Sequence, residues 1–170
     1  GRKRLFVAGM AVFTLTSLGA GFASSGTELI LWRVVQGVGG AFVFALAGAL
    51  VTDAFPREKL GLAMGTNVMV AAVGLVIGPV LGGGLVEYGW AWVFWFNVPL
   101  GALGTVWAAL VLQEMSRAEG ERTYDVPGNL LALGGLTGLV LALSDAGLDG
   151  WSAPMVVIGL IAAALLLPAF

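Results

Sequence analysis

The stretch that decides the fold is GLVIGPVLGGG, residues 74–84, inside an apolar run from Leu60 to about Tyr88. The run is long enough to cross a bilayer as a helix, which takes about 20 mostly apolar residues. Its centre nevertheless contains glycine and proline, the residue types that a helix in water avoids. Lipid offers the backbone no alternative hydrogen-bonding partner, so a membrane helix tolerates them. The stretch therefore predicts a membrane helix in which glycine has a packing role.

Within this stretch, Gly74, Gly78 and Gly82 recur every four residues and therefore share one face of the helix. Small residues let neighbouring membrane helices approach closely, so we expect this face to meet another helix. Pro79 removes one backbone hydrogen bond and should bend the helix. The pattern fits either tight packing alone or a moving contact, and the proline favours the moving contact. A second small-residue stripe is formed by Gly37, Ala41, Ala45 and Ala49.

The composition is that of a polytopic membrane protein. Of the 170 residues, 59% are hydrophobic and only 11% are charged, whereas a soluble domain carries about 25% charged residues. The chain has no Cys and no His, which argues against disulfides, thiolate chemistry and the usual transition-metal sites. We expect no metal, no cofactor, no nucleic-acid partner and no enzymatic activity, because no nucleophile–base pair, metal set or basic patch is present.

Six apolar runs predict an all-α bundle of about six transmembrane helices. They cover residues 5–23, 29–55, 60–87, 92–113, 128–145 and 154–170. The fifth run is short and rich in glycine, and the sixth is cut by the end of the chain. This pattern divides the chain into a helical region of residues 1–113, a polar loop 114–127 and a helix pair 128–170.

The loops alternate in charge, which predicts the orientation of the chain in the membrane. Segments 1–4, 55–60 and 113–125 carry Arg2, Lys3, Arg4, Arg57, Lys59, Arg117 and Arg122, whereas segments 23–28, 87–92 and 144–154 carry no Lys or Arg. The positive-inside rule places the first set in the cytoplasm. Tryptophans fall near the opposite ends of the spans, as an interfacial belt would: Trp32, Trp90, Trp92, Trp95 and Trp151.

Arg33 is the one basic residue outside the predicted cytoplasmic loops. It lies about a turn and a half inside the outer end of the second span. Its side chain could extend to the outer headgroups. Alternatively it faces the bundle interior, where a cation binds an anion or changes the proton affinity of a carboxylate. Gln36 follows one turn later on nearly the same face, so the two residues form a short polar stripe.

Asp53 lies at the cytoplasmic end of the same span, where the helix dipole disfavours an anion. The basic cluster of residues 2–4 is on the same side of the membrane. A salt bridge from Asp53 to Arg2 or Arg4 would join the inner ends of two helices. The alternative is a solvated carboxylate, because exposed ion pairs contribute little.

Several segments resemble the major facilitator superfamily of transporters. WRVVQGVGGA (32–41) resembles the R-x-x-Q-G segment of helix four, and GLVIGPVLGG (74–83) resembles the G-x-x-x-G-P-x-x-G-G antiporter motif of helix five. GRKR (1–4) resembles the end of the loop between helices two and three. WVFWFNVPLG (92–101) and DVPG (125–128) resemble the fourteen-helix drug:proton antiporter branch.

The resemblance implies that the chain is an internal fragment running from helix 3 to helix 8. Residues 1–113 would then belong to the first six-helix half, and 128–170 would be the linker pair of this branch. It implies proton coupling for Arg33, a gate salt bridge for Arg2 and Asp53, and a hinge made of Gly74, Gly78, Pro79, Gly82 and Gly83.

The implied function is a proton-coupled antiporter in the cell membrane, of the bacterial inner-membrane type. Its partners would be an amphipathic or cationic organic substrate, protons, the lipid bilayer and the transporter helices outside this chain. Two alternatives remain. The first is a transporter of the same superfamily with a non-drug substrate. The second is a membrane scaffold without transport, which glycine faces alone would support equally well but which Arg33 and Gln36 disfavour.

Overall fold

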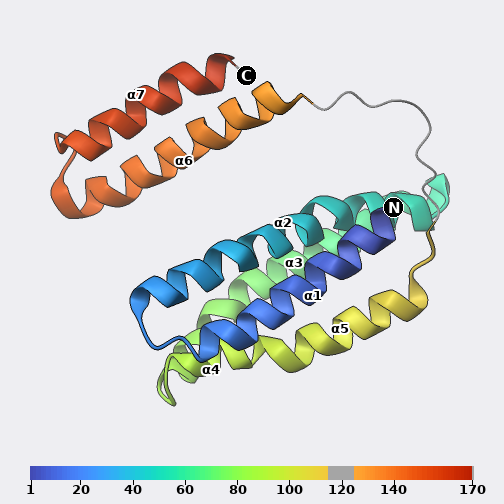
Figure 1. Cartoon of the computed structure of the whole chain (residues 1–170). Helices are drawn as coiled ribbons and strands as arrows, with labels where there is room; N and C mark the ends of the chain where they lie inside the picture. The colour runs from blue at the N-terminus through green and yellow to red at the C-terminus, as the bar shows by residue number, and fades with distance from the viewer. Residues whose placement is uncertain (115–124, 170) are drawn as a thin grey trace. The chain divides into compact units, whose positions relative to one another are not determined.

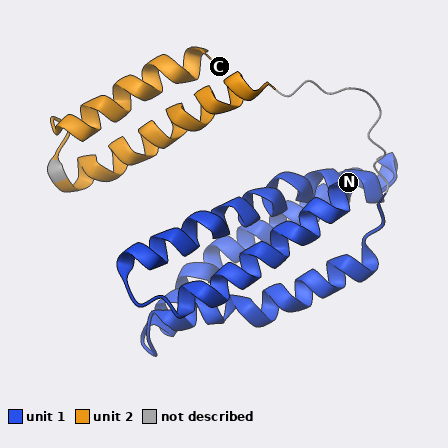
Figure 2. Cartoon of the chain, viewed as in Figure 1, with its two compact units in different colours: residues 1–118 blue, residues 119–170 orange. Residues whose placement is uncertain are grey.

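The computed structural model describes residues 1–114 and 125–169, and all regular structure in these ranges is α-helical. The chain divides into two compact units, residues 1–118 and 119–170 (Figure 2). The helices are α1 (Arg2–Gly21), α2 (Gly26–Ala54), α3 (Arg57–Val86), α4 (Ala91–Trp95), α5 (Asn97–Val111), α6 (Val126–Asp149) and α7 (Pro154–Ala169) (Figure 1). The predicted all-α class is confirmed.

Five helical segments of the described chain are long and apolar enough to cross a membrane: α1, α2, α3, α6 and the pair α4–α5 taken together. The predicted spans agree with them to within a few residues at most ends. The fifth predicted span is too short, because α6 continues to Asp149. Its glycines do not end the helix, and Gly150 with φ +84° does so instead. The sixth predicted span corresponds to α7, which has 16 residues.

The fourth predicted span is interrupted at Phe96, where α4 ends and α5 begins. Pro99 follows three residues later and has no N–H to donate to the preceding turn. The amide Nδ2 of Asn97, the first residue of α5, donates to the Val93 carbonyl at 3.1 Å. The Asn97 side chain thus bonds a carbonyl of the preceding helix, and the two helices continue as one segment of 21 residues.

Helix α1 is the central element of unit 1 and lies between α2 and α5 (Figure 1). Its closest approach to α2 is at Gly9 and Gly39, both of which are buried. A Cβ added to Gly39 would lie 2.8 Å from the Gly9 carbonyl oxygen and 2.8 Å from the Phe13 nitrogen. Only glycine allows two backbones to come this close.

The small-residue stripe of the second span does not meet another helix among the described residues. Nothing lies within 4 Å of a Cβ added to Gly37, and Ala41 and Ala45 are exposed. The helix is rotated so that Gly39 faces α1. The four-residue spacing of the stripe predicts a shared face correctly, but spacing does not say which face meets the neighbour.

The turn between α1 and α2 fixes where α2 begins. The Ser25 hydroxyl caps the helix by accepting from the Glu28 N–H at 3.2 Å. The Glu28 carboxylate in return accepts from the backbone N–H and the hydroxyl of Ser24, both at 2.9 Å. Reciprocal bonds of this kind satisfy helix donors that would otherwise lack partners. This start places Arg33 about two turns into α2.

Helix α3 has no buried residue, although it contacts α2 and α4. Nothing lies within 4 Å of a Cβ added to Gly74, Gly78, Gly82 or Gly83. The expectation that this glycine face meets another helix is therefore not met within the described residues. Helix α3 continues through Pro79 from Arg57 to Val86. The bend expected at Pro79 stays a prediction.

The second unit contains the antiparallel pair α6–α7, whose backbones approach at Gly138 and Gly159. A Cβ added to Gly138 would lie 3.0 Å from the Gly159 carbonyl oxygen, and one added to Gly159 would lie 2.9 Å from the Ala142 Cβ. Ala142 and Ala163 are buried in the same contact. Asp125 caps α6 by accepting from the Gly128 N–H at 2.9 Å.

We expect Gly39→Leu to lower the free energy of unfolding by about 1–3 kcal/mol, because the new side chain collides with backbone atoms of α1. Gly37→Leu on the same helix is the matched control and should change it by less than about 0.5 kcal/mol. Unfolding of the purified chain in micelles, followed by circular dichroism during titration with SDS, measures both. Equal losses for the two variants would contradict the packing described.

Gly159→Val should separate α6 from α7, since Ala142 and the backbone of Gly138 leave no room for a branched side chain. Hydrogen exchange followed by mass spectrometry should then be faster in residues 126–149 and 154–169 and unchanged in α1 and α2. Gly147→Val is the control, because nothing lies within 4 Å of a Cβ there. Slow exchange retained in the Gly159 variant would refute the contact.

Candidate functional site

Arg33 and Gln36 are brought together as predicted, and a third residue from α1 joins them. The Arg33 Nη1 donates to the Gln36 Oε1 at 2.6 Å. The Gln36 Nε2 donates to the Ser17 hydroxyl, and this hydroxyl donates to the Phe13 carbonyl at 2.9 Å. Gln36 is 1% exposed and Ser17 is fully buried. The result is a hydrogen-bonded chain from a guanidinium on α2 to the backbone of α1.

The aromatic ring of Phe94 supports the guanidinium from a second side. The Arg33 Cζ lies 5.9 Å from the centroid of this ring, which belongs to α4. A guanidinium over an aromatic face is attracted by the ring quadrupole. Three elements, α1, α2 and α4, therefore contribute to the surroundings of Arg33. The sequence reasoning missed Ser17 and Phe94, because neither lies near residue 33 in the chain.

The direction of the Arg33 side chain bears on its two predicted environments. Arg33 lies seven residues after Gly26, which is about 10 Å along α2 at ~1.5 Å per residue. A side chain extending to the outer headgroups would point back toward Gly26. Its guanidinium instead bonds Gln36, which lies farther from that end of the helix. The guanidinium thus points away from the outer end of α2, while the residue itself is exposed within unit 1. Its environment in the membrane stays a prediction.

At the other end of the same helix pair, Arg2 forms the ion pair with Asp53. The Arg2 Nη1 lies 2.7 Å from Oδ1 and 2.8 Å from Oδ2 of the carboxylate. The side chains are 34% and 25% exposed. Arg4, the other predicted partner, is exposed and pairs with no carboxylate among the described residues. Arg2 and Arg4 are two residues apart on α1 and therefore point in nearly opposite directions. Only Arg2 is on the side of α1 that faces Asp53.

This pair compensates two unfavourable charges. Arg2 is the first residue of α1, where the helix dipole disfavours a cation, and Asp53 is in the last turn of α2, where it disfavours an anion. Each charge placed alone would cost about 0.3–1 kcal/mol. Joined to each other, they hold the two helix ends together.

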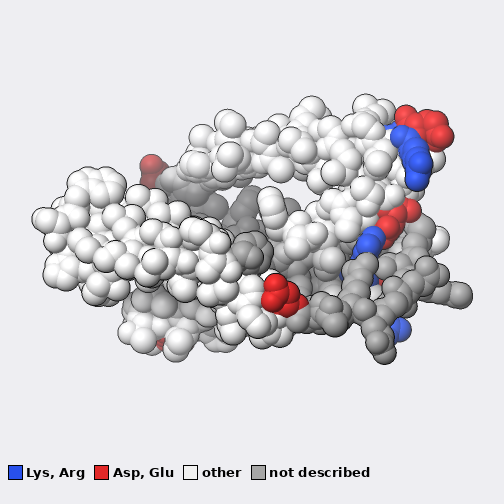
Figure 3. Space-filling model, turned by 90° about the horizontal axis from the view of Figure 1, so that it is seen from above, with Lys and Arg blue, Asp and Glu red and all other residues white. Residues whose placement is uncertain are grey.

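Apart from Arg33, the Lys and Arg residues of unit 1 that the structure describes lie at one end of the helices. The Lys and Arg atoms visible in Figure 3 lie at one end of the view, whereas Asp and Glu atoms also appear elsewhere. The predicted basic loops 1–4 and 55–60 both lie at the same end of the helices, since α1 begins, α2 ends and α3 begins there (Figure 1). In the third predicted loop, 113–125, residues 115–124 with Arg117 and Arg122 lie outside the described residues.

A cavity of about 840 Å³ lies among α1, α2, α3 and α5. Most of its lining is apolar and includes Met10, Phe13 and Phe44. Asn67 of α3 and Asn97 of α5 add carboxamide groups to its wall. A mostly apolar wall with a few polar groups suits an amphipathic molecule or a further apolar helix. The sequence alone does not place these two asparagines, which lie on different helices, around one cavity.

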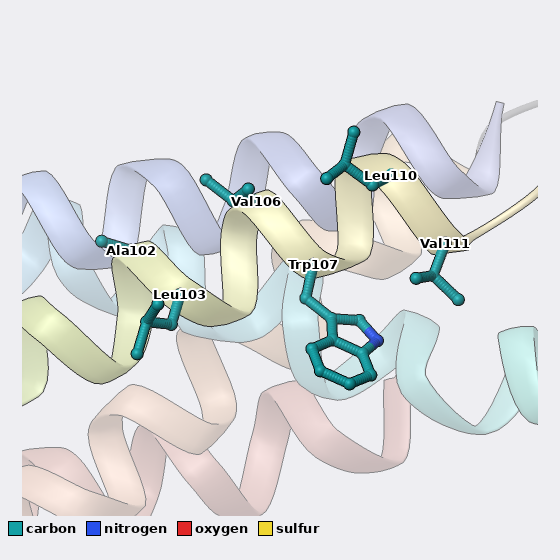
Figure 4. Close-up of a pocket in the computed structure, with 6 residues that line it drawn as sticks. All are labelled: Ala102, Leu103, Val106, Trp107, Leu110 and Val111. Carbon is teal, nitrogen blue, oxygen red and sulfur yellow. The ribbon is translucent and has the colours of Figure 1, made fainter.

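A second hollow lies along α5 and is lined by Ala102, Leu103, Val106, Trp107, Leu110 and Val111 (Figure 4). All six residues belong to one helix, and their side chains are apolar apart from the indole nitrogen of Trp107. Apolar side chains along one side of a single helix are what a surface facing lipid requires, so this hollow has no feature of a binding site. Among the described residues, no group of three or more carboxylates, histidines or cysteines is placed to bind a metal.

Comparison with known proteins gives a family-level match. Residues 1–128 match the family model described as Major Facilitator Superfamily. The chain is 42% identical over 113 residues to the "Uncharacterized MFS-type transporter Rv1250" of Mycobacterium tuberculosis, covering 66% of this chain and 20% of that protein. It is 35% identical over 163 residues to the "Putative multidrug resistance protein MdtD" of Escherichia coli, covering 95% of this chain and 34% of that protein.

The chain thus spans about a third or less of the length of these relatives. The match includes all of unit 1 and therefore both the Arg33 and the Arg2 contacts. Together with the apolar helices described above, it shows that this multi-pass membrane chain belongs to the Major Facilitator Superfamily.

Proposed function

We propose that the chain belongs to a proton-coupled antiporter that exports drugs or other amphipathic small molecules by alternating access. The observation that carries this proposal is the direction of the Arg33 side chain. Its guanidinium bonds Gln36, one turn farther from Gly26 along α2, instead of extending to the outer end of the helix. An ionisable group within a membrane span is costly and marks a functional site by default. The name of the Escherichia coli relative supports a multidrug substrate class.

In the proposed mechanism, Arg33 acts as a fixed positive charge. A cation close to a carboxylate favours the ionised form and lowers its affinity for protons. Movement of that carboxylate toward or away from Arg33 would therefore release or take up a proton. A proton released in one state of the transporter and bound in the other couples substrate export to the proton gradient. The carboxylate belongs to another region of the transporter.

The Arg2–Asp53 pair serves as a cytoplasmic gate contact in this proposal. Its partly exposed position makes it weak, about 0.2–1 kcal/mol for comparable pairs. A weak contact suits a gate, because it must form in one state and break in the other. In this proposal the membrane is a bacterial inner membrane, and the basic ends 1–4 and 55–60 lie on its cytoplasmic side, as the positive-inside rule predicts.

The open glycine face of α3 also fits a transporter that is longer than this chain. Gly74, Gly78 and Gly82 form a flank without side chains, next to Pro79 and Gly83, and nothing lies within 4 Å of a Cβ added to any of these glycines. In the proposal, a helix outside this chain lies against this flank and slides or tilts as access alternates. Small-residue faces allow such close contact between membrane helices.

Two other functions are weighed against this one. A transporter of the same superfamily with a non-drug substrate would keep every feature described, and only transport assays separate it. A scaffold without transport would use the glycine faces but has no use for the Arg33–Gln36–Ser17 chain. This chain of hydrogen bonds therefore favours transport, and the superfamily relatives favour it over an enzyme.

Arg33→Ala in the complete gene product should reduce proton-driven export at least tenfold, because the fixed charge is lost. Export of a fluorescent amphipathic cation from proteoliposomes with an imposed pH gradient measures this effect. Arg33→Lys should retain some of the activity, since it keeps the charge and loses the planar fork. Arg57→Ala, which removes an exposed cation at the start of α3, is the control and should leave export within about twofold of the wild type.

If export by the Arg33→Ala protein retains its wild-type rate and its dependence on the pH gradient, the coupling role is wrong. If the wild-type protein moves no amphipathic cation but carries another solute with protons, the drug class is wrong and the antiporter remains. Absence of any proton-linked flux would favour the scaffold.

The gate is tested by exchanging its charges. Arg2→Asp and Asp53→Arg should each slow export about three- to tenfold, and the double variant should recover most of it because the pair re-forms with opposite polarity. The recovered pair also places each charge at its favourable helix end. Arg4→Asp is the matched control, since Arg4 has no such partner among the described residues. Failure of the double variant to recover would remove the gate assignment.

A further inference from the structure

We propose that Ser17 and Phe94 are positioning residues for Arg33: Ser17 acts through the amide of Gln36, and Phe94 acts directly on the guanidinium. The inference rests on the proposed function, because it assigns the groups that hold the proton-coupling charge in place. It adds two residues from α1 and α4 to a site that the sequence motif confines to α2.

The Ser17 hydroxyl points its proton along α1, toward the preceding turn. Ser17 is fully buried and donates its one proton to the Phe13 carbonyl at 2.9 Å. Its oxygen is then available only as an acceptor for other groups. The residue that faces it is Gln36, which is 1% exposed. Ser17 can therefore bond the NH₂ end of the Gln36 amide and not its oxygen end.

The Gln36 amide has a donor end, the NH₂ group, and an acceptor end, the oxygen. With its nitrogen toward Ser17, the Gln36 side chain turns its oxygen toward Arg33, which it meets at 2.6 Å. The reversed amide would place NH₂ against the guanidinium, which has five donors and no acceptor. It would also place the oxygen against a hydroxyl whose proton is already used. The serine thus decides which end of Gln36 Arg33 meets, and so where the guanidinium is held.

The guanidinium of Arg33 is held by the Phe94 ring as well as by Gln36. One of the five N–H groups bonds Gln36, and a single hydrogen bond leaves the planar group free to rotate. The Phe94 ring, 5.9 Å from Cζ, favours orientations in which the plane stays near the ring. Gln36 and Phe94 together hold the charge while leaving donors for an anionic partner.

The charged and titratable surroundings of Arg33 are sparse in the described residues. On α1 the charges end at Arg4, and α4 and α5 carry none. The nearest charge on α2 itself is Glu28, which bonds Ser24. Glu87 and Tyr88 follow α3. Neither the Glu28 nor the Glu87 carboxylate pairs with Arg33 within 4.0 Å. If a substitution of Ser17 or Phe94 changes the pH dependence of export, we therefore expect the change to act through the position of the Arg33 charge.

The test uses the complete gene product in proteoliposomes and measures the initial export rate as a function of pH. Ser17→Ala should move the midpoint of the profile by about 0.5–1 pH unit to higher pH. The sign follows because a less firmly held cation lowers the proton affinity of a nearby carboxylate less. Ser17→Thr keeps the hydroxyl and should restore the midpoint. Phe94→Leu should shift it in the same direction, and Phe94→Tyr should not.

Thr16→Ala is the matched control. Thr16 is also buried on α1 and also donates to backbone carbonyls, those of Val12 and Phe13, but it forms no hydrogen bond with Gln36. It should lose as much stability as Ser17→Ala without moving the midpoint. Thermal unfolding of every variant in micelles separates loss of folding from loss of position.

Three outcomes distinguish the positioning role of Ser17 and Phe94 from the proposed function itself. A midpoint shift in Ser17→Ala and Phe94→Leu, absent in Thr16→Ala, supports the inference. If Arg33→Ala changes the pH profile while both positioning variants match the wild type, the positioning role is wrong and the proposed function stands. If Arg33→Ala leaves the profile unchanged, the proposed function fails and the positioning role fails with it.

Discussion

The close approach of α1 and α2 is the interaction on which the rest of unit 1 depends. In a bilayer there is little hydrophobic drive between helices, so contact relies on close packing and on hydrogen bonds. Gly9 and Gly39 allow the two backbones to come within the reach of short side chains. With larger residues at these positions the helices would stand farther apart, and the Ser17 hydroxyl would not reach Gln36.

Three contacts lie in order along this helix pair: Arg2 with Asp53, Gly9 with Gly39, and Ser17 with Gln36. On α1 they are seven and eight residues apart, which is about two turns each at 3.6 residues per turn. They therefore lie on one face of α1. A single helix face thus positions the ion pair at one end, the backbone contact between, and the support of Arg33 at the other end. A change in the rotation of α1 would disturb all three.

Helix α3 shows the opposite situation, because none of its residues is buried although it contacts α2 and α4. It carries glycine at four-residue spacing and proline within the helix, yet no described residue lies against this flank. In lipid the backbone keeps its own hydrogen bonds without tertiary support. The aligned residues make up only 20% and 34% of the lengths of the two relatives, which is consistent with this open flank.

The amino-acid sequence by itself determined the helical class, the approximate spans and the superfamily motifs. These depend on local quantities: run length, hydropathy and the spacing of a few residues. It also named Arg33, Gln36, Arg2 and Asp53, because charges within or at the ends of apolar runs are conspicuous. The roles of these residues in coupling and gating stay predictions.

Only the tertiary structure decided which partner each residue meets. It selected Arg2 over Arg4, placed Gly39 rather than Gly37 against α1, and brought Ser17 and Phe94 to Arg33. It also left the glycine face of α3 uncovered among the described residues. The physical reason is that a helix of mostly apolar residues has almost no preferred inner face in lipid. Its rotation is set by the neighbour that fits its small and polar residues, which no local pattern contains.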